Sequence, residues 1–274
     1  MPRGTPTQAI RGHHHAEGKP VTVITSDRPI RLVTFDLYDT LVEALPPRWE
    51  RFAIATQRAG LQGDAETFKK ADRIAEDFYT IENGQFPIRD RAPEDIEAFR
   101  LAYTARMLEA AGVESDLDTT RRIREIFVSE FDASGWNYRV FDDVNPALAL
   151  LEDHGIKRAV ISNADADVTN FCLHLGFAAH MDLIVTSALV GFEKPDSRTY
   201  FAALDPLQIA PEDGLHVGDQ ALSDVVGARA IGMAAAIIDR YERHSDDEHD
   251  AVRVTSLTQL AELVISHNTQ FAVR

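Results

Sequence analysis

The chain contains two kinds of hydrophobic pattern. Short apolar runs rich in Val, Ile and Leu alternate with stretches in which apolar residues recur every three or four positions. The runs are typical of buried parallel strands, and the stretches are typical of amphipathic helices. The predicted strands are residues 31–36, 158–162, 183–186, 215–219 and 235–238. Strands that alternate with helices indicate an α/β fold around a parallel sheet.

A long helical stretch separates the first predicted strand from the second. Residues 48–133 carry apolar positions at helical spacing, with breaks at Gly60, at 82–85 and at Gly112. About ninety residues of helix are far more than an ordinary connection requires, so we predict a separate module here. The predicted parts are a mobile N-terminal tail at 1–28, an α/β core at 29–45 and 138–274, and a helical module at 46–137.

Composition and charge narrow the class of protein. The 274 residues are 45% hydrophobic, enough for a sizeable core, and the net charge is -16. This charge argues against nucleic acid or an anionic membrane surface as a partner. The single cysteine, Cys172, excludes an internal disulfide, and no apolar run approaches the ~20 residues of a membrane span. Because the N-terminus also lacks a signal-peptide core, we expect a soluble cytoplasmic protein.

Two polar segments receive no catalytic role. The first contains His13, His14 and His15, which lie in the predicted tail. The second is the acidic run at 245–250, which is most simply a solvated loop.

Polar side chains stand at the ends of the predicted strands and in the loops that follow them. They are Asp36, Ser162, Asn163, Lys194, Asp219 and Asp224. Each alone has an ordinary structural interpretation as a helix cap, a turn residue or a surface lysine. A parallel sheet, however, brings these strand ends to one edge, where ligands bind. Carboxylates beside a lysine suit Mg²⁺ and a phosphate group, so the sequence predicts a site of this kind.

These motifs, in this order, resemble the haloacid dehalogenase (HAD) superfamily. The resemblance covers residues 30 to about 240 and includes the helical insertion. Its motifs are Phe-Asp36-Leu-Tyr-Asp-Thr40-Leu, Val-Ile-Ser162-Asn163, Glu-Lys194-Pro and Val-Gly-Asp219-Gln-Ala-Leu-Ser-Asp224. It implies a Rossmann-like, HAD-like core with an inserted α-helical cap that closes over the site.

The resemblance also implies a role for each matching residue. Asp36 would be the nucleophile that forms an aspartyl intermediate, and Lys194 would orient it and offset negative charge. Ser162 and Asn163 would bind the transferring group. The implied Mg²⁺ ligands are Asp36, the backbone carbonyl of Tyr38, Asp219 and, directly or through water, Asp224. The expected activity is a Mg²⁺-dependent phosphatase for a small phosphorylated metabolite.

One position departs from the family's phosphatases. These enzymes carry a second Asp two residues after the nucleophile, as the general acid for the leaving group. Tyr38 holds that position here. Asp39 follows it, and on an extended segment its side chain points to the opposite face. A structural role is therefore favoured for Asp39.

Tyr38 also leaves other activities open. It resembles the metal-independent 2-haloacid dehalogenase branch, in which a carboxylate displaces halide and no acid is required. Asp219 and Asp224 favour phosphoryl transfer instead, since carboxylates that converge on Asp36 without a cation would repel one another. Dehalogenation and a non-catalytic binding protein on this fold remain the alternatives.

Substrate choice is expected to lie in the helical module. The candidates to face the site are Trp49, Phe86, Arg89 and the segment 82–85. Packing is the simpler interpretation for Trp49 and Phe86, and solvent exposure is the simpler one for Arg89.

Overall fold

The computed structural model describes residues 23–133, 137–244 and 251–272. Most of the predicted tail, including His13–15, and the acidic run at 245–250 lie outside the described residues. Within the described part, Ile24 is buried in the hydrophobic core and Arg28 pairs with Asp213. The packed part of the chain therefore begins before residue 29, where we predicted that the core starts.

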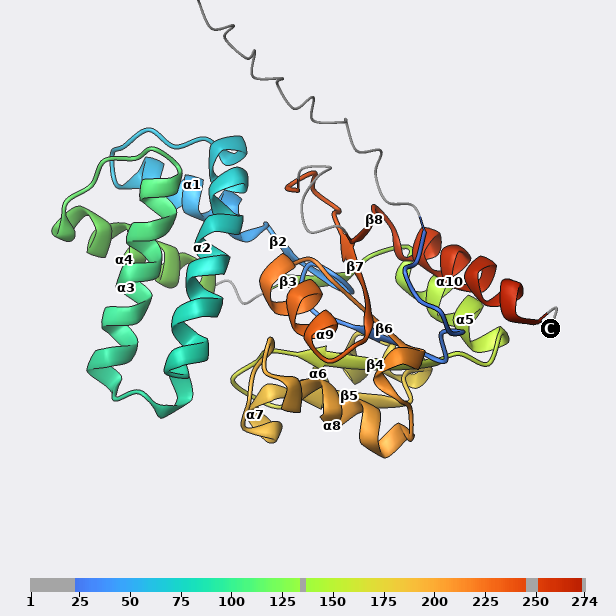
Figure 1. The fold of residues 1–274 in the computed structure, drawn as a ribbon. Helices are drawn as coiled ribbons and strands as arrows, with labels where there is room; N and C mark the ends of the chain where they lie inside the picture. The colour runs from blue at the N-terminus through green and yellow to red at the C-terminus, as the bar shows by residue number, and fades with distance from the viewer. Residues whose placement is uncertain (1–22, 134–136, 245–250, 273–274) are drawn as a thin grey trace, which may run out of the picture.

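Six parallel strands form the central sheet, in the order β5-β4-β1-β6-β7-β8 (Figure 1). They are β1 (Leu32–Phe35), β4 (Lys157–Ser162), β5 (Leu183–Thr186), β6 (Gly214–Gly218), β7 (Ala234–Ile238) and β8 (Val252–Val254). The first five confirm the predicted strands. β8 was not predicted, because three residues are too few to show a period. The fully buried β1 lies between β4 and β6, so Asp36 emerges at the centre of the sheet edge.

Helices cover both faces of the sheet. They are α5 (Val144–Asp153), α6 (Thr169–His174), α7 (Ser187–Val190), α8 (Ser197–Leu207), α9 (Gly227–Ala230), α10 (Leu257–Ala272), and the short helical turns η2 (Ala178–His180), η3 (Pro211–Asp213) and η4 (Ala221–Val226). On one face, α5 and α10 pack on Val33 and Phe35. On the other face, α8 and α9 pack in the cluster that contains Leu32. Successive residues of β1 thus serve opposite faces, as an extended strand requires.

The inserted residues form a helical unit beside the core (Figure 1). Its elements are α1 (Arg48–Arg58), α2 (Ala65–Gln85), η1 (Ile88–Asp90), α3 (Pro93–Ala110) and α4 (Leu117–Ala133). It has a hydrophobic cluster of its own, built on Phe52, Phe68 and Met107. The predicted break at 82–85 is wrong as an interruption, because α2 continues through it to Gln85. Asn83 and Gly84 are tolerated there, since the buried Asn83 side chain accepts a hydrogen bond from the Ile88 amide (2.6 Å).

An antiparallel ribbon joins the helical unit to the core. The chain leaves the core along β2 (Val42–Leu45) and returns along β3 (Asn137–Val140). Neither strand was predicted from the sequence, because four residues paired with a partner about a hundred positions away leave no local signal. The ribbon fixes the exit and the return of the insertion side by side.

Candidate active site

The first part of the site is a lysine held between two carboxylates. Lys194 Nζ lies 2.6 Å from Asp36 Oδ1 and 2.6 Å from Asp224 Oδ1. The lysine is only 3% exposed, so both ion pairs are shielded from solvent. Three of the residues predicted from separate strand ends are therefore brought together.

The loop that carries Lys194 is fixed by Asn163. The Asn163 side chain accepts a hydrogen bond from Lys194 N (2.8 Å) and donates one to Lys194 O (2.9 Å). Both hydrogen-bonding ends of the amide are thus engaged with the backbone of the lysine. Ser162, at the end of β4, is buried, and its Oγ has no hydrogen-bond partner among the described residues. Ser162 therefore offers the less committed hydrogen-bonding group at this strand end.

Asp224 is anchored on all sides. Besides Lys194, its Oδ1 lies 3.1 Å from His216 Nε2, and its Oδ2 accepts a hydrogen bond from Gln220 N (3.0 Å). Thr34 Oγ1 lies 2.8 Å from His216 Nδ1. Because a carboxylate only accepts, Nε2 of His216 carries the proton and Nδ1 accepts from the threonine hydroxyl. His216 was not predicted from the sequence, because it lies inside the apolar strand β6 without a motif of its own.

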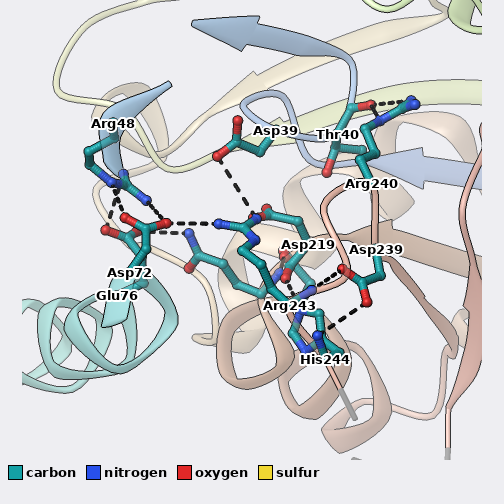
Figure 2. Close-up of polar contacts among 12 residues, drawn as sticks. Asp39, Thr40, Arg48, Asp72, Glu76, Asp219, Asp239, Arg240, Arg243 and His244 are labelled. Carbon is teal, nitrogen blue, oxygen red and sulfur yellow. Dashed lines mark hydrogen bonds and ion pairs between the residues drawn. The ribbon is translucent and has the colours of Figure 1, made fainter. Parts of the chain in front are cut away.

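A second buried cation, Arg243, pairs with Asp219 (Figure 2). Its guanidinium is 2.7 Å from Asp219 Oδ2, 2.8 Å from Asp72 Oδ2 of α2 and 4.0 Å from Asp39 Oδ2. The side chain is only about 5% exposed. Arg243 was also missed, since it stands in a polar loop after β7 where an arginine usually signals solvent. It neutralises a predicted metal ligand and at the same time joins the core to the helical unit.

Further polar contacts continue this connection into the helical unit (Figure 2). Arg48 pairs with Asp72 (2.8 Å) and Glu76 (3.1 Å). Glu76 also accepts hydrogen bonds from Tyr103 (2.7 Å) and from Gln220 of the core (3.0 Å).

Arg89 forms a second connection between the two parts. It pairs with Glu193 (3.0 Å) and donates to the backbone oxygen of Gly191, while Asn83 also donates to Glu193. Arg89 is exposed, as expected, and Glu193, the core residue next to Lys194, supplies its counterion.

Burial sets the protonation behaviour of the carboxylates. It raises the pKa of Asp36 to about 6, although the Lys194 charge acts in the opposite direction. Burial also raises the pKa of Asp219, against the effect of Arg243. For Asp224, burial is outweighed by Lys194 and His216, which hold its pKa below the ordinary value.

Tyr38 and Asp39 point in different directions. The Tyr38 ring packs near Tyr138 (5.5 Å between centroids) and Phe171 (6.2 Å), and it lines a cavity above Asp36. Burial raises the pKa of the Tyr38 hydroxyl. Asp39 has a backbone φ of +56° and its carboxylate faces Arg243 (Figure 2). It is not among the residues found to line the cavity in the described part of the chain.

The cavity lies between the core and the helical unit. It has a volume of about 620 Å³ and is lined by Asp36 and Lys194 on one side and by side chains of α1, α2, α3 and α4 on the other. Among the described residues, Trp49, Phe86 and Arg89 are not part of this lining. Trp49 packs on Tyr241 (4.7 Å between centroids), and Phe86 is 45% exposed beneath Arg91.

Residues 30–232 match the family model of the haloacid dehalogenase-like hydrolases. The chain belongs to this family. Haloacid dehalogenase-like hydrolase domain-containing protein 3 of Bos taurus is 28% identical over 210 residues, which cover 76% of this chain and 82% of the relative. Phosphoserine phosphatase of Thermus thermophilus is 29% identical over 235 residues, 80% of this chain and 92% of that protein.

Solved structures of haloacid dehalogenase-like proteins share the fold. A predicted phosphoglycolate phosphatase from Haemophilus somnus superposes with a TM-score of 0.58 at 18% identity, covering 85% of this chain and 97% of that chain. Both the superfamily and the α/β fold class predicted from the sequence are confirmed. None of the helices in the described ranges combines the length and the apolar character needed to cross a bilayer.

The oxygen atoms of this hydrolase are a suitable donor set for Mg²⁺, with one restriction. Asp219 Oδ1 is buried and has no partner among the described residues, so a second cation would satisfy it. In the described part of the chain, however, no group of three or more His, Cys, Asp or Glu side chains stands ready to hold a metal. Lys194 already engages Asp36 and Asp224, and Arg243 engages Asp219. Both oxygens of Asp224 already accept hydrogen bonds, from Lys194 and from the amide of Gln220.

Proposed function

We propose that this hydrolase is a Mg²⁺-dependent phosphatase that acts on a small phosphate monoester through an aspartyl-phosphate on Asp36. The observation that carries the proposal is the buried Lys194, which bridges Asp36 and Asp224 at 2.6 Å. Unlike the buried Asp72, the Asp36 carboxylate that Lys194 holds lines the cavity, where a substrate could reach it. Relatives named phosphoserine phosphatase and glyceraldehyde 3-phosphate phosphatase support the same reaction class.

Each residue of the site has its own role in the proposed reaction. Lys194 holds Asp36 Oδ1, which leaves Oδ2 to attack the phosphorus while the bond to the ester oxygen breaks. Water then attacks the phosphorus of the aspartyl-phosphate, which releases inorganic phosphate and restores Asp36. Ser162 Oγ would donate to the transferring group.

Asp36, Asp219 and the Tyr38 carbonyl are the proposed holders of Mg²⁺. A bound Mg²⁺ would offset the charge of the phosphoryl oxygens. Asp219 would face it through its unpartnered Oδ1, while Arg243 keeps hold of Oδ2.

The helical unit is proposed to act as a cap over Asp36. It supplies most of the far wall of the cavity, and contacts on two sides of the cavity hold it to the core. A closed unit would exclude bulk water from the reacting atoms.

The proposed site offers only a weak acid, Tyr38, to protonate the leaving oxygen. A tyrosine hydroxyl has an ordinary pKa of about 10, so Tyr38 would donate a hydrogen bond more readily than a proton. Substrates whose leaving oxygen needs little protonation are therefore favoured.

Dehalogenation is the second candidate, and Tyr38 is the observation that favours it. Halide leaves without a proton, so a tyrosine in place of the general acid would not slow this reaction. Lys194 and Arg243 also reduce the repulsion among the carboxylates, which weakens one argument for a metal. The buried and unpartnered Asp219 Oδ1 favours the metal-dependent phosphatase. A non-catalytic binding protein is less favoured, because it would have no use for a nucleophile held by Lys194.

Parallel assays separate these candidates. Release of phosphate from 4-nitrophenyl phosphate is measured with Mg²⁺ and with EDTA, and release of chloride from 2-chloropropionate is measured beside it. We expect Mg²⁺-dependent phosphate release that the Asp36→Asn variant lacks, because that variant has no nucleophile. Metal-independent chloride release would establish the dehalogenase instead. If neither product forms, a binding protein is the better description.

A further inference from the structure

The cavity above Asp36 exceeds the space that a phosphate and a short carbon chain require. At about 620 Å³ it falls within the range of pockets that hold drug-sized organic ligands. It extends from Lys194 and Asn163 in the core to the helices α3 and α4. Because the phosphoryl group must lie at Asp36, the far end of the cavity belongs to the leaving group.

Aromatic side chains of the helical unit form much of this far end. They are Phe52, Tyr79, Phe99, Tyr103 and Phe127, here called the aromatic wall. Phe52 and Phe127 stack with 4.4 Å between ring centroids, and Tyr79 lies 5.1 Å from Phe99. Aromatic faces and edges of this kind favour either another planar ring or a cation.

Arginines of the same wall decide between a ring and a cation. Arg48, Arg100 and Arg124 all line the cavity. Glu76 is the carboxylate among the described lining residues of the helical unit, and Arg48, Tyr103 and Gln220 already engage it, so a cationic group would meet an excess of like charge there. Arg48 is held by Asp72 (2.8 Å), and Arg124 is held by Glu97 (2.9 and 3.0 Å). A planar ring is therefore the better occupant of the aromatic wall.

Arg100 differs from the other two arginines. It is an exposed residue that reaches the cavity, and its guanidinium makes no hydrogen bond and no ion pair with any residue in the described ranges. Its charge acts on the pKa of Tyr79 and of Glu97 from a longer distance. Glu97 lies one turn earlier on α3, and both of its carboxylate oxygens already accept hydrogen bonds from the Arg124 guanidinium. The planar guanidinium of Arg100 is therefore available to bind an anion in the cavity.

We propose that the substrate is an aryl phosphate whose ring carries a second anionic group, with the ring against the aromatic wall and the anion at Arg100. This inference rests on the proposed phosphatase function and adds the chemical class of its leaving group. An aryl oxygen also leaves with little protonation, which agrees with Tyr38 at the position of the acid. Asp165 lines the core side of the cavity, so the second anion is directed away from the core and toward α3.

Ligand binding to the inactive Asp36→Asn variant tests the ring and the anion separately. Dissociation constants are measured by calorimetry with Mg²⁺ for phenyl phosphate, cyclohexyl phosphate and 4-carboxyphenyl phosphate. We expect phenyl phosphate to bind about fivefold more tightly than cyclohexyl phosphate, because only the planar ring matches the aromatic wall. The added carboxylate should tighten binding about tenfold further.

A second substitution assigns the carboxylate gain to Arg100. Adding Arg100→Ala should abolish that gain, and Arg100→Lys should restore only part of it, since a lysine keeps the charge but lacks the fork. Arg106→Ala is the matched control, because Arg106 lies on the same helix, is exposed, and pairs with Glu109 away from the cavity. It should leave the gain intact. Should Arg100→Ala unfold, which circular dichroism would reveal, Arg100→Gln replaces it.

The outcomes distinguish this inference from the proposed function. If wild-type protein hydrolyses 4-nitrophenyl phosphate but the three ligands bind equally, the aryl-phosphate inference fails and the phosphatase stands. A carboxylate gain that persists in both Arg100→Ala and Arg100→Gln also overturns it. If no ligand binds and no phosphate is released, both proposals fail.

Discussion

At the residue scale, Tyr38 is the position that most directly limits the proposed chemistry. Replacing it with aspartate, Tyr38→Asp, should restore a general acid beside the leaving oxygen and raise kcat on an alkyl phosphate about tenfold or more. The gain on 4-nitrophenyl phosphate should be smaller, since that leaving group needs little protonation. Steady-state kinetics on both substrates check this, with Tyr38→Phe as the control that removes only the hydroxyl. An equal change on both substrates would mean that protonation does not limit the rate.

The residues of the site differ in how far the sequence predicted them. Asp36, Lys194 and Asp224 were predicted to converge because each follows a strand, and the ion pairs at 2.6 Å join them. Arg243 was missed because its partner Asp72 lies 171 positions away and no local pattern links them. A loop arginine also looks the same in sequence whether it is solvated or buried.

At the element scale, the turn from β6 into η4 positions both Asp219 and Asp224. Gly218 is required there, since an added Cβ would lie 2.1 Å from Asp224 Oδ2. We expect Gly218→Ala to cost about 1–3 kcal/mol of unfolding free energy and to lower activity, because the Asp224 side chain must move. Urea unfolding measures the loss.

The matched control for this substitution lies in α2. A Cβ added at Gly84 would meet nothing within 4 Å, so Gly84→Ala should stabilise the protein by about 0.5–1 kcal/mol through helix propensity. Equal effects of the two substitutions would contradict the steric argument at Gly218.

Elements were predictable where a period extends over enough residues. Five strands and the long helices of the insertion followed from apolar runs and spacing. The missed strands β2 and β3 are no shorter than β1 or β5, but they carry charged and exposed residues, and β8 has only three residues. The six residues of η4 form a π-helix, whose wider turn has no signature in the hydrophobic pattern. Elements defined by their partners, rather than by their own sequence, are the ones that were missed.

At the scale of the whole molecule, the net charge is -16, but buried carboxylates near the site are paired with cations. Asp36, Asp72 and Asp219 are all buried, and each is paired with a lysine or an arginine. Two of the pairing cations also connect parts of the molecule that are distant in sequence. The balance of charge at the site is therefore also the means by which the helical unit is held on the core.

Arg243 carries the last prediction, because it joins the core to α2. Replacing it with glutamine, Arg243→Gln, removes its ion pairs with Asp72 of α2 and with Asp219 of the core. The loss should be about 3 kcal/mol for each buried pair that is broken, and the Asp72 share should weaken docking of the helical unit. Amide hydrogen exchange in α2 and in the β2–β3 ribbon should then accelerate, while exchange in β1 and β6 stays slow.

Two further variants give this experiment its controls. Glu97→Gln breaks the Arg124 pair, which lies wholly within the helical unit, and should leave exchange in the ribbon unchanged. Asp72→Asn removes the contact with Arg243 from the other side, together with the Arg48 pair inside the helical unit. If the contact carries the docking, the double variant should lose less than the sum of the two single losses. Additive losses, or an unchanged ribbon in Arg243→Gln, would mean that Arg89 and Glu193 hold the unit closed without Arg243.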